Sequence, residues 1–242
     1  MNLQEILNIV NFFCAKETEG QTMTPVQYNS LLPYAVNEVY GLYILKDWDT
    51  EQRFTDASMP FKVYMGQREF TDLTGNTISA IPPLMIDANG YANIPSDYKR
   101  YSSLRFKETT NSATCGVQIK DRDVLVLTDQ EYDAYLNSSI KKGTYKHPMC
   151  NFQKGYIRFY PTNLAYVDFV YLKYPTTPVY GYTIDALTQQ VIYDATTSTQ
   201  LEFRTEECYK LVASLLSAIG VNLSSEVIMS AAQSKEIKNL VV

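Results

Sequence analysis

Histidine is almost absent from this sequence, and the scarcity limits the chemistry that the chain can perform. The one histidine, His147, lies in Lys146-His147-Pro148, where the pattern indicates a loop with no nucleophile motif nearby. No glycine-rich loop of the kind that cradles phosphate groups occurs. A pair of catalytic carboxylates that meets only in the folded chain stays open, because sequence spacing does not reveal it. We therefore expect a protein that is not an enzyme, with no catalytic residue, no cofactor and no cofactor-binding residue.

Cysteine is also sparse, with four residues and no closely spaced pair. This usage is typical of reduced thiols in a cytoplasmic product rather than of a disulfide framework. Two of the cysteines lie on apolar helical stripes, which predicts that they pack in a core. The four are Cys14, Cys115, Cys150 and Cys208, of which the first and the last lie on those stripes.

Clusters of metal ligands are lacking as well. His147 and Cys150 have the spacing of two ligands, but a structural zinc ion needs four, and the other cysteines are distant in sequence. The segment Asp47 to Glu51 resembles the start of a calcium loop, yet the required glycine and terminal glutamate are absent. We expect no metal site, and a solvated acidic turn at Asp47 to Glu51.

The chain has no excess of basic residues and no long apolar run. Its 26 acidic and 21 basic residues give a net charge of -5, which argues against tight binding to duplex nucleic acid. The apolar stretches are too short to span a bilayer, and the N-terminus lacks the basic segment of a signal peptide. We expect a soluble protein made in the cytoplasm, with no membrane partner.

Tyrosine, by contrast, is abundant, with 20 residues against 10 phenylalanines and 1 tryptophan. Its ring has an apolar body and a polar tip, which suits half-buried sheets and surfaces that meet other proteins. A tyrosine-rich β domain and a ligand platform are both compatible with this usage, and the β domain is favoured.

The N-terminal region predicts helices. Apolar residues recur at helical spacing from Leu3 to Cys14. A second helix begins after Thr24, because Thr24 can cap it, Pro25 fits its first position and Gln27 can return a capping-box bond. Pro33 lies inside this second helix and predicts a kink or break near residues 29–32, since an interior proline costs about 3 kcal/mol.

The middle of the chain predicts antiparallel strands joined by tight turns. We expect a hairpin around Asn89-Gly90, a strand from Tyr98 to Phe106 and a capping-box helix that begins at Thr128. Further strands are expected in pairs, because alternating apolar residues flank short turns. These segments are 81–86 with 91–94, 116–120 with 123–127, 155–160 with 166–173, and an extended arm or strand pair within 179–193.

The C-terminal region predicts two more helices. An apolar stripe runs from Cys208 to Ile219, Gly220 is suited to a left-handed C-terminal cap with Val221 closing it, and a second helix begins near Ser224. The two ends of the chain bury their stripes most economically against each other. The expected fold class is therefore α+β: a discontinuous helical bundle from residues 1–80 and 196–242, with an antiparallel β domain inserted at 81–195.

Four phrases along the chain resemble the ring-forming structural proteins of crAss-like and related Bacteroidetes bacteriophages. Their order and spacing carry the resemblance, which covers most of the chain. The phrases are Thr24-Pro-Val-Gln-Tyr-Asn-Ser-Leu-Leu, Ile94-Pro-Ser-Asp-Tyr, Leu127-Thr-Asp-Gln-Glu-Tyr-Asp with Asn137-Ser-Ser-Ile and His147-Pro, and Ser198-Thr-Gln-Leu-Glu-Phe.

This resemblance implies a head-to-tail connector, an adaptor ring below the portal of a short-tailed phage. It implies a virion protein, located in the neck or tail region, that forms a dodecameric ring with copies of itself. The portal protein and the next ring or tail protein are the other implied partners, and genomic DNA only passes through the lumen. An acidic chain agrees with such a lumen, because basic residues would hold the phosphates in place.

The last residues of the chain are apolar where solvated residues are usual. We expect them either to contact the portal or a neighbouring subunit, or to fold back on their own bundle. The alternative function is a β-rich tail module that binds a receptor or carbohydrate, or a tail gatekeeper. The candidate contact residues are Ile237, Leu240, Val241 and Val242.

Overall fold

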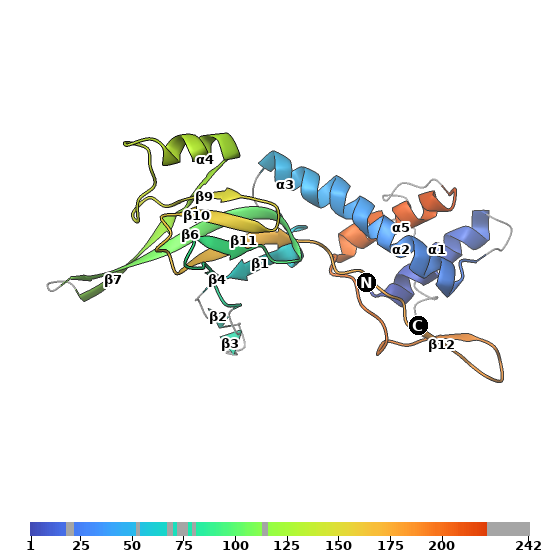
Figure 1. The fold of residues 1–242 in the computed structure, drawn as a ribbon. Helices are drawn as coiled ribbons and strands as arrows, with labels where there is room; N and C mark the ends of the chain where they lie inside the picture. Colours follow the sequence, from blue (N-terminus) through green and yellow to red (C-terminus); the bar gives the residue numbers. More distant parts are fainter. Residues whose placement is uncertain are drawn as a thin grey trace. The chain divides into compact units, whose positions relative to one another are not determined.

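The computed structural model describes residues 1–17, 22–51, 54–66, 70–71, 77–78, 81–112 and 116–221. It is a mixed α+β protein, as the sequence predicts (Figure 1). The chain divides into two compact units, one formed by Met1–Phe61 with Pro175–Val242 and the other by Lys62–Tyr174. The expected boundaries lay near residues 80 and 195. They differ because strand β1 (Lys62–Met65) already pairs in a sheet, whereas strands β12 (Tyr182–Ile184) and β13 (Val191–Tyr193) belong with the helices.

The first unit begins with two helices whose starts are fixed by local side chains. In α1 (Leu3–Glu17), Asn2 Oδ1 accepts from the backbone N–H of Glu5 at 2.8 Å, and Glu5 Oε2 accepts from that of Asn2 at 2.9 Å. In α2 (Pro25–Val39), Thr24 and Gln27 form the predicted reciprocal capping box. The predicted starts of both helices are confirmed.

Of the predicted kink or break near residues 29–32, the break is wrong. Helix α2 continues through this proline, and a π-helical segment, η1 (Tyr40–Leu45), and helix α3 (Lys46–Glu51) follow without a gap. Pro33 has no N–H to donate to the carbonyl of Asn29, so one helical bond is missing. Burial of Tyr28, Leu32 and Val36 against the rest of the unit offsets this loss. A short 3-10 helix, η2 (Met59–Phe61), ends this part of the unit.

Helix α5 (Thr205–Ala218) returns to the same unit and packs against α1 and α2. Its stripe is buried as predicted from Cys208 to Leu216, but Ile219, the last residue of the predicted stripe, is 37% exposed. The predicted C-terminal cap is also present: Gly220 has φ of 90°, and Val221 donates its N–H to the carbonyl of Leu216 at 2.8 Å. The helix expected from Ser224 lies outside the described residues.

The second unit contains two sheets that share one apolar core. One sheet has the strand order β1-β11-β6-β7, with β4 also paired to β11, and the other has the order β5-β10-β9-β8. Side chains from both sheets are buried together, including Phe106, Phe159 and Phe169. The strands are β4 (Leu84–Met85), β5 (Tyr91–Asn93), β6 (Tyr98–Ser112), β7 (Gly116–Asp123), β8 (Leu125–Leu127), β9 (Met149–Phe152), β10 (Tyr156–Tyr160) and β11 (Tyr166–Lys173), and β2 (Phe70–Thr71) pairs separately with β3 (Thr77–Ile78).

Several predicted hairpins are wrong in their pairing although their strands exist. Strands β4 and β5 flank the expected turn, where Gly90 has φ of 85°, but they pair with β11 and β10 instead of each other. Strands β10 and β11 likewise lie in different sheets. Strands β8 and β9 are parallel, so the unit is not wholly antiparallel. In the first two cases the turn lies where the sequence predicts it, but packing between distant segments selects the partner strand.

Helix α4 (Asp129–Leu136) lies along the sheet that contains β9 (Figure 1). Thr128 and Glu131 form its predicted capping box. Tyr132 is buried with Leu127 and Met149, so the helix covers part of the outer face of this sheet. Among the described residues, no helix is both long and apolar enough to cross a membrane.

Candidate functional site

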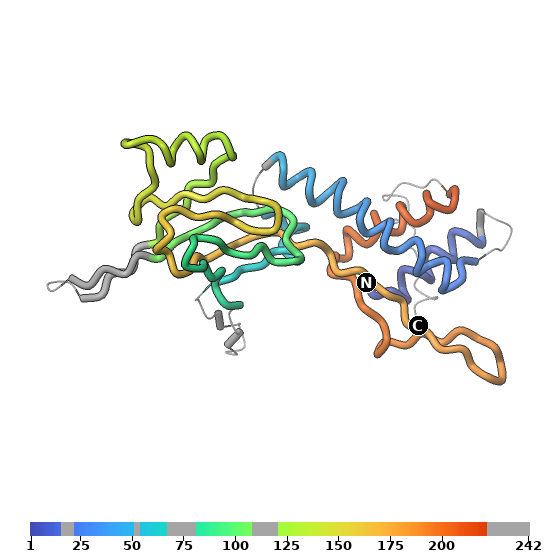
Figure 2. Tube along the Cα trace, viewed as in Figure 1, coloured from blue at the N-terminus to red at the C-terminus, as the bar shows by residue number. Residues whose placement is uncertain are grey.

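An exposed β-hairpin is the first candidate interaction surface. It consists of β12 (Tyr182–Ile184) and β13 (Val191–Tyr193), and we call residues 182–193 the arm. Figure 2 shows the arm, in orange, as a hairpin that extends away from the helices of its own unit. Its strands pair Ile184 with Val191 on one face and Thr183 with Ile192 on the other. The sequence left open an extended arm or a strand pair here, and the structure has the strand pair.

Apolar side chains on the arm face solvent. Leu187, at the tip, is 94% exposed, and Ile184 is 58% exposed. Val191 and Ile192 are also exposed, and because they lie on opposite faces, neither face of the hairpin is covered. A two-stranded hairpin is at best marginally stable by itself in water. The arm is therefore a surface suited to contact with another molecule.

Contacts with the helices hold the base of the arm. The Asn29 side chain on α2 bonds the backbone of Tyr180 twice: its Nδ2 donates to the carbonyl at 2.9 Å, and its Oδ1 accepts from the N–H at 2.8 Å. The Tyr180 ring packs edge-on against the buried Tyr28, and its hydroxyl donates to Gln4 on α1. These contacts tie the arm to the first turns of α1 and α2.

The tip of the arm is ordered by its own hydrogen bonds. Asp185 Oδ1 accepts from the backbone N–H of Leu187 at 2.7 Å and of Thr188 at 3.0 Å. Backbone hydrogen bonds from Thr188 and Leu187 lower the pKa of Asp185, because they stabilise the carboxylate. The turn closes at Gln189, which has φ of 56°. Leu187 is thus presented on a preorganised turn.

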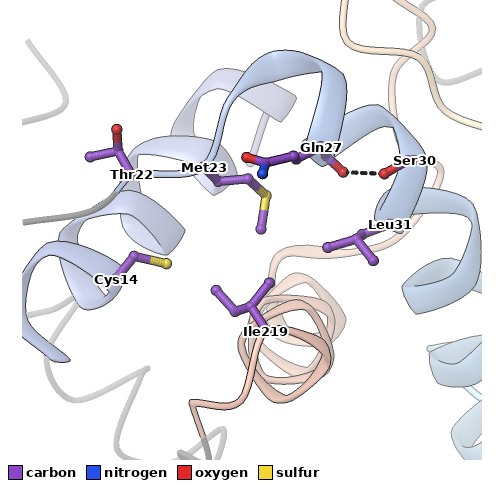
Figure 3. A pocket seen from close by; sticks show the side chains of 7 residues that line it. All are labelled: Cys14, Thr22, Met23, Gln27, Ser30, Leu31 and Ile219. Carbon is purple, nitrogen blue, oxygen red and sulfur yellow. Dashed lines mark hydrogen bonds between the residues drawn. The ribbon is translucent and has the colours of Figure 1, made fainter. Parts of the chain in front are cut away.

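A pocket in the same unit is the second candidate surface. It has a volume of about 350 Å³ and lies among the end of α1, the start of α2 and the end of α5. Figure 3 shows Met23, Leu31 and Ile219 pointing toward one another, with Cys14 at one side. Thr22, Gln27 and Ser30 complete the lining with uncharged polar groups, and Ser30 Oγ donates to the carbonyl of Gln27 at 2.7 Å. The pocket is suited to an apolar side chain with polar neighbours.

Tyrosines on the outer face of the second sheet form a third candidate surface. Tyr91 and Tyr156 meet edge to face at 5.3 Å, and both are more than a third exposed. Arg158, on the same strand as Tyr156, lies 5.3 Å from the ring centre of Tyr132. Burial raises the pKa of Tyr132 to about 12, although Arg158 acts in the opposite direction. This arrangement is compatible with the ligand platform that the tyrosine content leaves open.

A buried ion pair lies in the first sheet of the same unit. Lys107 Nζ on β6 is 3.1 Å from Asp168 Oδ2 on β11, and the Tyr64 hydroxyl on β1 donates to the same oxygen at 3.1 Å. Asp168 Oδ1 is buried and has no hydrogen-bond partner in the described part of the chain. Lys107, Asp168 and Tyr64 together link strands β6, β11 and β1, and we interpret the ion pair as a contact that supports the sheet.

The structure separates the residues that sequence spacing paired as ligands. His147 is exposed, whereas Cys150 is fully buried in the core between the sheets. Asp47 and Asp49 lie on helix α3, so the expected acidic turn is helical instead. Within the described ranges, no group of three or more His, Cys, Asp or Glu side chains is placed to hold a metal ion.

The candidate contact residues Ile237, Leu240, Val241 and Val242 lie outside the described residues. Sequence reasoning missed the tip of the arm and the pocket. The signal for the arm was present, because Ile184, Leu187, Val191 and Ile192 are apolar residues next to the polar residues of a predicted turn. The pocket had no local signal, since its lining comes from three helices that are distant in sequence.

Comparison of the chain with models of known protein families and with curated protein sequences found no match. A functional assignment therefore depends on the sequence phrases and on the surfaces described above.

Proposed function

We propose that this chain is a virion structural protein of a short-tailed bacteriophage. It forms an adaptor ring below the portal, in the head-to-tail connector through which DNA passes. Its partners are other copies of itself in a dodecameric ring, the portal protein, and the next ring or tail protein. It has no enzymatic role, and DNA occupies the lumen without specific contacts.

The exposed arm is the observation that carries this proposal. The arm is an ordered hairpin with exposed apolar side chains on both faces. Such exposed apolar patches favour association with another molecule. A ring subunit needs such a surface, since each copy contacts the next through two different patches. The net charge of -5 supports the same function, because an acidic lumen does not retain DNA.

In this proposal the helices from both chain ends form the body of the ring. The packing of α5 against α1 and α2 supports this assignment, since it joins the two ends of the chain in one unit. Ile237, Leu240, Val241 and Val242 remain the proposed portal or neighbour contacts. The second unit, Lys62–Tyr174, then faces the next ring, the tail or the exterior.

Mass photometry of the purified protein, alone and mixed with the portal of the same phage, tests this function. We expect a closed oligomer, or a portal-bound ring when portal is added. A protein that stays monomeric with portal present would contradict the proposal.

A second candidate function is carbohydrate binding by the unit Lys62–Tyr174. The exposed pair Tyr91 and Tyr156 favours it, because such rings supply apolar contact area next to polar groups. Titration with host surface polysaccharides, followed by thermal shift, tests this function. Binding that is lost in Tyr156→Ala but kept in Ile140→Ala, an exposed control, would support it; no shift with any polysaccharide would exclude it.

A further inference from the structure

One unit of this chain carries both an apolar protrusion and an apolar pocket. We propose that the tip of the arm of one copy inserts into the pocket of the next copy, with Leu187 as the inserted side chain. This contact rests on the proposed ring function and specifies how neighbouring subunits meet. Its partner is a second copy of this chain.

The arm does not fill the pocket of its own chain. Leu187 itself is 94% exposed, so it contacts almost nothing within its own chain.

The tip and the pocket match in chemistry. Leu187 meets the apolar side chains of Met23, Leu31 and Ile219, and the volume of about 350 Å³ exceeds the ~150 Å³ that holds a benzene molecule. Asp185 is the only charged residue of the tip turn, and its carboxylate already accepts hydrogen bonds from that turn. Among the described residues the pocket lining carries no charge, so Leu187 meets uncharged groups there, and the Asp185 carboxylate keeps its hydrogen bonds within the turn.

A contact between a protrusion and a pocket is compatible with two types of assembly. In a head-to-tail arrangement it repeats around a ring or along a filament, as the proposed function requires. In a two-fold dimer each tip would enter the partner's pocket, so the assembly would stop at two chains. A ladder of higher oligomers from the Leu187→Cys and Ser30→Cys double variant supports the head-to-tail arrangement, and a product that stops at the dimer contradicts it.

Disulfide trapping between two single variants tests the contact. Both variants are made in a Cys14→Ala background, because the native Cys14 thiol also lines the pocket and would compete in the reaction. Leu187→Cys places a thiol on the tip, and Ser30→Cys places one in the pocket. We expect a covalent dimer on non-reducing gels only when the two proteins are mixed, and a ladder of higher oligomers from the double variant. Ile140→Cys, at another residue that is 91% exposed, replaces Leu187→Cys as the control and gives no dimer with Ser30→Cys.

A second measurement identifies what occupies the pocket. Self-association should slow maleimide labelling of Ser30→Cys, and adding Leu187→Asp should restore fast labelling. Leu187→Asp should weaken self-association at least tenfold, since burying a leucine contributes about 1.5–3 kcal/mol, whereas Ile140→Asp should not change it. Slow labelling that persists in the Leu187→Asp protein means that another occupant, such as residues 222–242, fills the pocket, and overturns the inference.

The failure of this contact is distinguishable from failure of the proposed function. If rings form or bind portal but the mixed variants give no disulfide, the subunits meet elsewhere and only the inferred contact is wrong. If no self-association and no portal binding occur, the contact and the ring function are both wrong.

Discussion

Asn29 on α2 should control the position of the arm. Its side chain makes two hydrogen bonds to the backbone of Tyr180, at 2.9 and 2.8 Å, and Asn29→Ala removes both. Each such bond contributes about 0.5–1.5 kcal/mol net, so the loss is about 1–3 kcal/mol. Alanine is the better helix former by up to ~0.7 kcal/mol, which offsets part of that loss.

Asn37→Ala provides the matched control. Asn37 is exposed on the same helix, so this variant has the same gain in helix propensity but keeps the hydrogen bonds that hold the base of the arm. The difference between the two variants isolates the contribution of the Asn29 side chain, about 1–3 kcal/mol. We expect Asn37→Ala to be neutral or slightly stabilising.

Amide hydrogen exchange is the appropriate assay, because the two compact units need not unfold together. Asn29→Ala should speed exchange at Tyr180 and through residues 181–194 by about tenfold, with helix α5 unchanged. Equal exchange at Tyr180 in the Asn29→Ala and Asn37→Ala proteins would show that the Asn29 side chain does not hold the arm.

Three further predictions concern the second unit. Lys107→Met should destabilise this unit by about 3–5 kcal/mol in chemical denaturation, because Asp168 stays buried without its cation. Adding Asp168→Asn should recover part of the lost stability. Equal stability of Lys107→Met and wild type would contradict the buried pair. Hydrogen bonds from the backbone and side chain of Thr128 lower the pKa of Glu131. The stabilising effect of the Glu131 carboxylate is therefore present above its unfolded-state pKa and is lost as pH falls through its folded-state pKa. An NMR titration that finds no lowered pKa for Glu131 would contradict this. Burial raises the pKa of the Cys150 thiol, so iodoacetamide should leave it unmodified in the folded protein at pH 8, and peptide mass spectrometry that finds it alkylated would contradict its place in the core.

The sequence predicted those features that depend on neighbouring residues. The capping boxes at Thr24 and Thr128 and the left-handed Gly220 each involve residues within a few positions. Their hydrogen bonds form whatever the rest of the chain does, so residue type and spacing are sufficient.

Strand pairing was not predictable in the same way. Strands β10 and β11 follow one another through a short turn, and the alternation in β11 favoured a two-faced hairpin. Both faces of β11 are instead partly buried, because Phe169 faces the shared core and Asp168 pairs with Lys107 on the other side. Choosing among partners depends on packing between distant segments, which local patterns do not report.

The candidate interaction surfaces also combine features that the local sequence shows with features that depend on distant segments. The apolar residues of the arm are visible in the sequence, but their exposure follows from a hairpin that is held only at its base. The pocket combines Cys14, Met23 and Ile219, which no spacing rule connects. Pro33 shows the reverse case, in which a strong local signal for a kink or break does not end the helix, because burial of the neighbouring residues outweighs it.

Electron microscopy of the purified virion, with averaging of its neck region, is the decisive experiment for the adaptor-ring function. We expect a ring of this chain directly below the portal, built from copies that contact each other head to tail. Mass spectrometry of the same particles should identify the chain among their proteins. Its absence from purified virions, or its presence only as isolated copies away from the portal, would contradict the adaptor-ring function.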